Sequence, residues 1–87
     1  MTPQQKELYR ENLLAQLDGA RIPVHASALL VGLRCGGFTK TDEPEMAREL
    51  EYLIEKGLVR LERSEISRGS RHYKITAAGI DYMEANA

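Results

Sequence analysis

The chain has 87 residues, of which 43% are hydrophobic and 29% charged, so we expect one globular domain over residues 1–87, with a core spanning about residues 6–85. Its net charge of −1 argues against strong, indiscriminate affinity for nucleic acid. No stretch approaches the roughly 20 apolar residues that cross a bilayer, and the first residues hold no apolar signal core, so we expect a cytoplasmic protein that binds no membrane.

Charge is unevenly distributed along the chain. Residues 42–56 hold six acidic and two basic side chains, whereas residues 57–74 hold five basic and two acidic ones. The chain is therefore polarised, with an acidic segment directly before a basic one.

Two helices are expected in the first 37 residues. Thr2-Pro3 is a favourable helix start, and the helix should end near Asp18-Gly19. Its apolar stripe at helical spacing consists of Leu8, Leu13, Leu14 and Leu17. An extended, edge-strand segment near residues 22–24 should precede a second helix, which starts at His25-Ala26-Ser27 and is stopped by Gly36-Gly37.

A third helix is predicted between residues 42 and 57. Asp42 or Glu43 should cap it, with Pro44 in the first turn and Glu45 placed to complete the capping arrangement. The side chains predicted to face the core are Met46, Leu50, Leu53 and Ile54. The helix should end at Lys56-Gly57.

After Gly57 the apolar period changes from 3.6 to 2, which predicts a hairpin of residues 58–63 and 71–76. Its buried face should carry Val59, Leu61, Tyr73 and Ile75. Thr76 is expected to cap a last short helix from Ala77 to about Ala85, with Ile80 and Met83 packed on the core.

Two segments carry a resemblance to known regulators. Leu50–Val59 resembles the end of the recognition helix in bacterial regulators, and Tyr73–Tyr82 resembles the segment after the wing in PadR-like and MarR-like regulators. Together with the order of elements, they identify an α+β winged helix: a three-helix bundle with a β-hairpin wing, a short N-terminal strand and a short C-terminal helix. These families usually dimerise through long flanking helices, which we do not expect within residues 1–87, so the sequence leaves monomer and homodimer both open.

The resemblance implies a small transcriptional regulator that binds double-stranded DNA, of a bacterial and phage-related type. Its third helix would enter the major groove, and its wing would contact the backbone or the minor groove. The candidate DNA-binding residues are Lys40, Arg48, Tyr52, Arg60, Arg63, Ser67, Arg68, Ser70, Arg71 and Lys74.

A second interpretation uses the same fold as a protein-docking module without DNA binding. Glu51 and Glu55 would lie close to phosphates in a DNA complex, which is unfavourable, but they suit a complementary protein surface. Ile66, an apolar residue near the wing tip, fits the same interpretation. Ordinary solvated charge on the helix and the hairpin is the third alternative.

Nothing in the sequence indicates catalysis. His25 and His72 lie far apart along the chain and are expected at the surface, and we find no nucleophile set, phosphate loop or metal-ligand cluster. Cys35, the single cysteine, can form no internal disulfide and is expected half-buried at a helix end. We therefore expect no enzyme activity, no cofactor and no metal.

Overall fold

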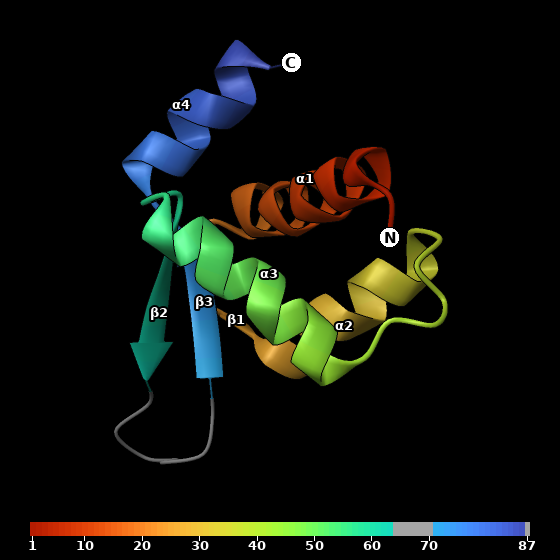
Figure 1. The fold of residues 1–87 in the computed structure, drawn as a ribbon. Helices are drawn as coiled ribbons and strands as arrows, with labels where there is room; N and C mark the ends of the chain where they lie inside the picture. Colours follow the sequence, from red (N-terminus) through yellow and green to blue (C-terminus); the bar gives the residue numbers. More distant parts are fainter. Residues whose placement is uncertain (64–70, 87) are drawn as a thin grey trace.

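The computed structural model describes residues 1–63 and 71–86. Within these ranges the chain forms four helices and three strands, arranged as a helix bundle with a small sheet at one side (Figure 1). The elements are α1 Pro3–Ala20, β1 Val24–His25, α2 Ala26–Cys35, α3 Glu43–Glu55, β2 Val59–Arg63, β3 Arg71–Ile75 and α4 Ala77–Ala85. This is the predicted α+β order of three helices, a hairpin and a closing helix.

Side-chain caps determine where the helices begin. The Thr2 hydroxyl accepts a hydrogen bond from the Gln5 amide, and the Gln5 side chain accepts one from the Thr2 amide, so α1 starts with a capping box. The Asp42 carboxylate accepts a hydrogen bond from the Glu45 backbone amide at 3.0 Å and caps α3 as predicted. The prediction that the Glu45 side chain completes this cap is wrong. Its carboxylate instead accepts a hydrogen bond from the Thr41 hydroxyl at 2.9 Å.

Residues in the left-handed region end α1 and follow α3. Gly57 has φ of 78°, and its amide donates to the Ile54 carbonyl at 2.9 Å, so the chain turns directly from α3 into β2. Helix α1 continues past its predicted end to Ala20, and Arg21 adopts φ of 55°. The Arg21 guanidinium is ion-paired with Asp18 at 2.9 Å, which helps to hold a non-glycine residue in this conformation.

The sheet is antiparallel and has the strand order β1-β3-β2. In the hairpin, Val59 pairs with Ile75 and Leu61 with Tyr73, which is the predicted alternation. Strand β1 lies later than predicted, because Val24 and His25 are the residues that pair with β3. Pro23 has no amide hydrogen to donate to a ladder, and Ile22 before it is 63% exposed.

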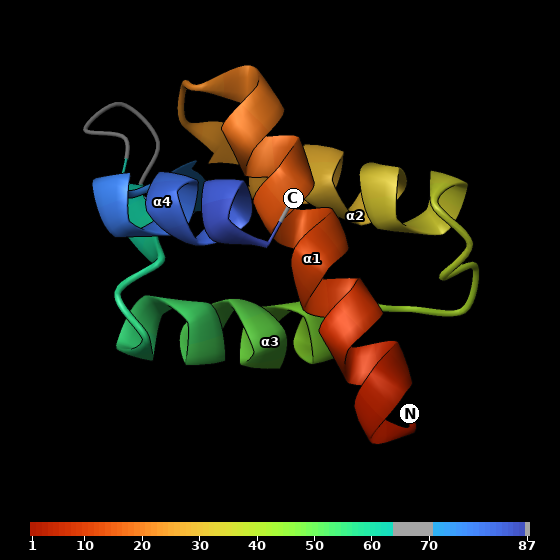
Figure 2. The ribbon, with the colours of Figure 1, turned by 90° about the horizontal axis from the view of Figure 1, so that it is seen from above.

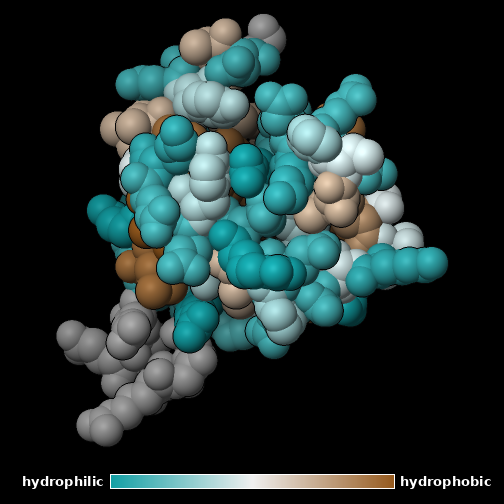
Figure 3. All heavy atoms as spheres, in the orientation of Figure 1, coloured by the Kyte–Doolittle hydropathy of each residue, from teal (hydrophilic) through white to brown (hydrophobic). Residues whose placement is uncertain are grey.

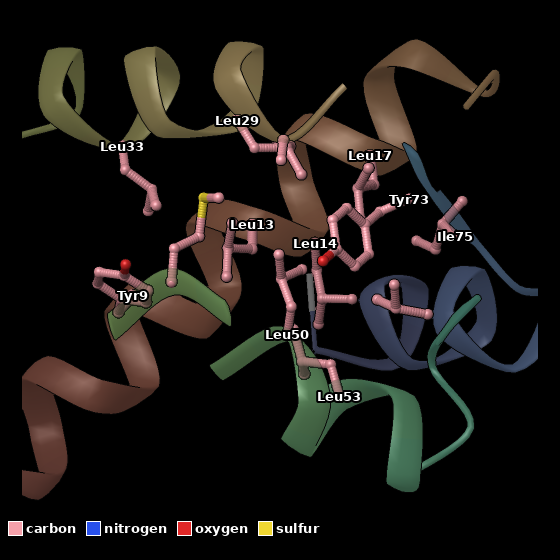
Figure 4. Close-up of a cluster of buried hydrophobic side chains, with 13 residues drawn as sticks. Tyr9, Leu13, Leu14, Leu17, Leu29, Leu33, Leu50, Leu53, Tyr73 and Ile75 are labelled. Atoms are coloured by element: carbon pink, nitrogen blue, oxygen red, sulfur yellow. The ribbon is translucent and has the colours of Figure 1, made fainter. Parts of the chain in front are cut away.

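The core lies between α1, α2, α3 and the inner face of β3 (Figure 4). Its labelled side chains are Tyr9, Leu13, Leu14, Leu17, Leu29, Leu33, Leu50, Leu53, Tyr73 and Ile75. One predicted member is wrong: Leu8 is 53% exposed, and the neighbouring Tyr9 is fully buried in its place. Residues 9, 13 and 17 share one helical face, whereas residue 8 is rotated by about 100° from residue 9.

Tyr9 joins α1 to the turn before α3. Its hydroxyl lies 2.7 Å from the Thr41 hydroxyl, and its ring makes an edge contact with Phe38 at a centroid distance of 5.0 Å. Burial raises the pKa of the Tyr9 phenol above its ordinary value of 10.0, and the nearby carboxylates act in the same direction. The hydrogen bond to Thr41 opposes this shift.

Helix α4 closes the bundle on the side of α1 (Figures 1 and 2). The Thr76 hydroxyl accepts from the Gly79 amide at 3.0 Å, and Ile80 and Met83 pack against the core, all as predicted. Gly79 is buried where a Cβ atom would lie 2.2 Å from the Leu58 carbonyl oxygen, so only glycine fits at this crossing.

Candidate nucleic-acid interface

The outward face of α3 carries the side chains predicted to meet DNA. Arg48, Glu51 and Glu55 are all exposed, on the side of the helix away from the buried Met46 and Leu53. The face of the molecule that α3 forms is covered mainly by hydrophilic residues (Figure 3). Because α3 leads through Gly57 directly into β2, its outward face lies next to the hairpin (Figure 1).

Part of the acidity of α3 is used inside the fold. Asp42 caps the helix, and Glu49 pairs with Arg10 of α1 at 2.7 Å while its side chain is only 12% exposed. The exposed acidic residues of the helix are Glu43, Glu51 and Glu55. The outward face is therefore less acidic than the sequence segment suggests, although Arg48 still lies among carboxylates.

Tyr52 has a structural partner that the sequence did not reveal. The guanidinium carbon of Arg10 lies 3.7 Å from the centre of the Tyr52 ring, and the Lys56 ammonium lies 5.6 Å from it. The ring therefore faces α1 and is stacked on a cation that also pairs with Glu49. Spacing within α3 alone could not show this contact, because Arg10 is distant in sequence.

The predicted basic residues of the hairpin lie on two different faces of the sheet. Arg60 and Lys74 are cross-strand neighbours on the face opposite Val59 and Ile75, which point into the core. Arg60 is ion-paired with Glu62 on its own strand. These two cations therefore lie on the side of the sheet away from the core and from α3.

Arg71 lies on the α3 side. It borders a hollow of about 250 Å³ together with His25, Glu43, Ala47 and Tyr73. The hollow thus joins the first strand residue after the wing, the N-terminal half of α3 and the cap of α2. Arg63 is the cross-strand partner of Arg71 and occupies the same end of the hairpin.

The two histidines, which are far apart in sequence, are neighbours in the fold. His25 pairs with His72 across β1 and β3, and their ring centroids lie 5.1 Å apart in an edge-to-face arrangement. The His25 Nδ1 also accepts from the Ser27 amide at 3.1 Å and so caps α2. Only the register of β1 on β3 brings them together, and the predicted strand near residues 22–24 did not include His25.

The remaining candidates are dispersed. Lys40 is exposed in the turn between α2 and α3. This turn lies at the end of the bundle away from the hairpin (Figure 1). Cys35 is exposed rather than half-buried, because it lies at the open end of α2. The predicted wing residues Ser67, Arg68 and Ser70, and the docking candidate Ile66, lie outside the described residues.

Two negative observations apply to the part of the chain that the structure describes. In residues 1–63 and 71–86, no group of three or more His, Cys, Asp or Glu side chains is placed to hold a metal ion. None of the helices in the same ranges combines the length and the apolar character needed to cross a membrane.

Two solved structures are similar to this chain along most of its length. One is a point mutant of MepR from a multidrug-resistant S. aureus clinical isolate, with a TM-score of 0.78 and 18% identity over 98% of this chain. The other is a PadR-like transcriptional regulator from Bacillus cereus, with a TM-score of 0.73 and 22% identity over 92% of this chain. This chain spans 64% of the length of the first structure and 78% of the second.

No protein-family model matches the chain, and no curated protein sequence matches it. At 18% and 22% identity, the two structures establish the fold. They confirm the winged-helix resemblance that Leu50–Val59 and Tyr73–Tyr82 indicated. The chain has a winged-helix fold.

Proposed function

We propose that this chain is a DNA-binding transcriptional regulator and not an enzyme. A similar structure is described as a transcriptional regulator, and the fold offers an exposed third helix beside a hairpin. The observation that carries the proposal is the position of Arg71, which borders one hollow with Glu43 and Ala47 of α3. A duplex that receives α3 in its major groove would thus meet a cation from β3 at the same time.

The roles within this interface differ. Arg48, exposed on the outward face of α3, is proposed to read a guanine edge, which accepts two hydrogen bonds from a guanidinium. Arg71 and the wing residues Ser67, Arg68 and Ser70 are proposed to bind phosphates. Arg60 and Lys74 lie on the other face of the sheet and are not proposed to contact this duplex.

The test compares two arginines of the same hairpin. We expect Arg71→Ala to weaken binding to all duplexes alike, because phosphate contacts position the protein without specifying sequence. The slope of log K against log salt concentration should flatten by about 0.9 for the one lost contact. Arg60→Ala removes the same charge from the opposite face of the sheet and should leave the slope nearly unchanged. Fluorescence anisotropy with mixed duplex DNA measures both.

A second candidate function is docking to a protein through the same helix. Glu51 and Glu55 are exposed and take part in none of the ion pairs among the described residues, so they are available to a basic partner. If the wild type shows no NMR chemical-shift change with duplex DNA at ~20 mM salt, where electrostatic binding is strongest, the DNA proposal fails. Protein docking through Glu51, Glu55 and Ile66 then becomes the leading function.

A further inference from the structure

A second surface of the molecule is hollowed and apolar. Helices α1 and α4 and the turn after α2 border an open groove of about 660 Å³. Leu8, Ala15, Phe38, Tyr82 and Met83 give it an apolar floor and walls. Figure 2 looks onto this side of the molecule, where α4 lies against α1.

The groove is exposed at its most apolar positions. Leu8 is 53% exposed and Tyr82 is 39% exposed, although each lies next to a side chain that packs into the core, Tyr9 and Met83 respectively. Both therefore extend the apolar surface of their helices beyond the core and into the groove. When a partner covers such a large apolar side chain, its removal from water stabilises the complex.

The rim of the groove is acidic. Glu11 and Asp18 of α1 and Glu84 of α4 border it, and none of the described residues that border it is Lys or Arg. Asp18 is paired with Arg21, whereas Glu11 and Glu84 take part in none of the ion pairs among residues 1–63 and 71–86. Helix α4 contains no basic residue, and its other acidic residue, Asp81, does not border the groove.

The charge and the shape of the groove together indicate which kind of partner it can bind. A second copy of this chain, seated by the same face, would bring its own acidic rim against this one, which is unfavourable. A groove between two helices suits a third helix, whose apolar residues at positions i, i+3, i+4 and i+7 fill it. We propose that the groove binds an amphipathic helix of a partner protein, with lysine or arginine residues on both sides of its apolar stripe.

This surface is separate from the proposed DNA interface. The groove shares no bordering residue with the hollow at Arg71 and α3. Strands β2 and β3 extend from α4 toward the opposite end of the molecule, so the Arg63–Arg71 end of the hairpin lies far from the groove (Figure 1). The chain can therefore hold DNA and a partner helix at the same time.

The test uses a synthetic helical peptide of leucine and lysine with this spacing, and a matched peptide in which glutamate replaces lysine. On adding the lysine peptide to the full 15N-labelled chain, we expect amide shifts confined to α1, α4 and residues 36–38. Leu8→Ser combined with Tyr82→Ser should raise the Kd by about tenfold or more, because both side chains are exposed anchors rather than core residues. Val31→Ser, which changes a residue that is 59% exposed outside the groove, is the matched control.

Charge reversal distinguishes a specific effect of the acidic rim from an effect of the overall net charge. Glu11→Lys combined with Glu84→Lys should weaken the lysine peptide by about tenfold and strengthen the glutamate peptide. The same net change on α3, Glu51→Lys combined with Glu55→Lys, should have a much smaller effect. The proposal is overturned if neither peptide causes shifts, if the shifts map to α3, or if both double charge variants weaken binding equally. It is also overturned if the free chain is a dimer that Leu8→Ser with Tyr82→Ser converts to monomer.

Discussion

At the scale of single residues, Tyr9 shows how one polar atom orients two helices. Its ring is fully buried, and its hydroxyl can donate to Thr41, whose own hydroxyl donates to Glu45. The chain of hydrogen bonds satisfies each polar atom in turn, which a buried phenol requires. Thr41 is also held through its backbone, because the Arg34 guanidinium donates to the Thr41 carbonyl oxygen at 3.0 Å. Side-chain and backbone contacts therefore fix the turn before α3 together.

We predict that Tyr9 makes the stability of the fold sensitive to alkaline pH. Burial raises the pKa of the phenol, so the folded state binds this proton more tightly than the unfolded state does. The stabilisation is complete below the unfolded value of about 10 and is lost as the pH rises through the higher folded pKa. Urea unfolding of the wild type should therefore show a fall in the free energy of unfolding above about pH 10.

Tyr9→Phe tests this dependence directly. It should cost about 1 kcal/mol at pH 8 through the lost hydrogen bond, and much of the alkaline fall in stability should disappear. Tyr82→Phe, at an exposed tyrosine, should keep the pH dependence of the wild type. An alkaline fall that is equal in wild type and Tyr9→Phe would show that other groups cause it.

At the scale of elements, two glycines in helices should respond in opposite directions to the same substitution. Gly79→Ala places a Cβ atom 2.2 Å from the Leu58 carbonyl oxygen and 2.6 Å from Ile75 Cγ1, so α4 must move off the sheet. We expect a loss of about 1–3 kcal/mol in the free energy of unfolding. Gly19→Ala meets no atom within 4 Å and should add about 0.5–1 kcal/mol through helix propensity. Thermal and urea unfolding measure both free energies, and equal effects would contradict the close packing of α4 on Leu58 and Ile75.

The elements whose signals are local could be predicted from the sequence. Asp42, Thr76 and Gly57 act through hydrogen bonds and backbone angles within a few residues, so the bounds of α3 and α4 followed from the chain itself. Individual side-chain contacts between helices that are distant in sequence could not be predicted. The burial of Tyr9 instead of Leu8 depends on where Thr41 and Phe38 lie, and no helical period within α1 records that.

The candidate site also combines features that the sequence predicts with features that depend on the tertiary structure. The exposure of Arg48 followed from its position opposite the apolar stripe of α3, as predicted. The stacking of Arg10 on Tyr52, the pairing of His25 with His72 and the division of Arg71 from Arg60 all depend on tertiary packing or strand register. Sequence spacing alone treated the hairpin cations as one strip, whereas strand alternation places them on two faces.

At the scale of the whole molecule, acidic and basic side chains are unevenly distributed over the surface. The outward face of α3 mixes Arg48 with Glu51 and Glu55, whereas the groove between α1 and α4 is bordered by acidic and apolar side chains and by no described Lys or Arg. The longest dimension of the molecule is 38 Å, whereas charges in 0.1 M salt are screened over about 10 Å. The charges of one surface are therefore largely screened from the other, and the net charge of −1 describes neither surface.

This separation leads to a prediction about the carboxylates of α3. If α3 enters the major groove, Glu51 and Glu55 lie close to phosphates, and Glu51→Gln combined with Glu55→Gln should tighten binding to every duplex at 0.1 M salt. Glu11→Gln combined with Glu84→Gln changes the net charge by the same amount on the groove side and should tighten it much less, because screening over about 10 Å weakens the distant charges. Fluorescence anisotropy on the same duplex compares the two pairs. Equal tightening by both would mean that overall charge governs binding, and no tightening by the α3 pair would place that helix away from DNA. If the α3 pair instead loses affinity for a basic protein, the docking function is the correct one.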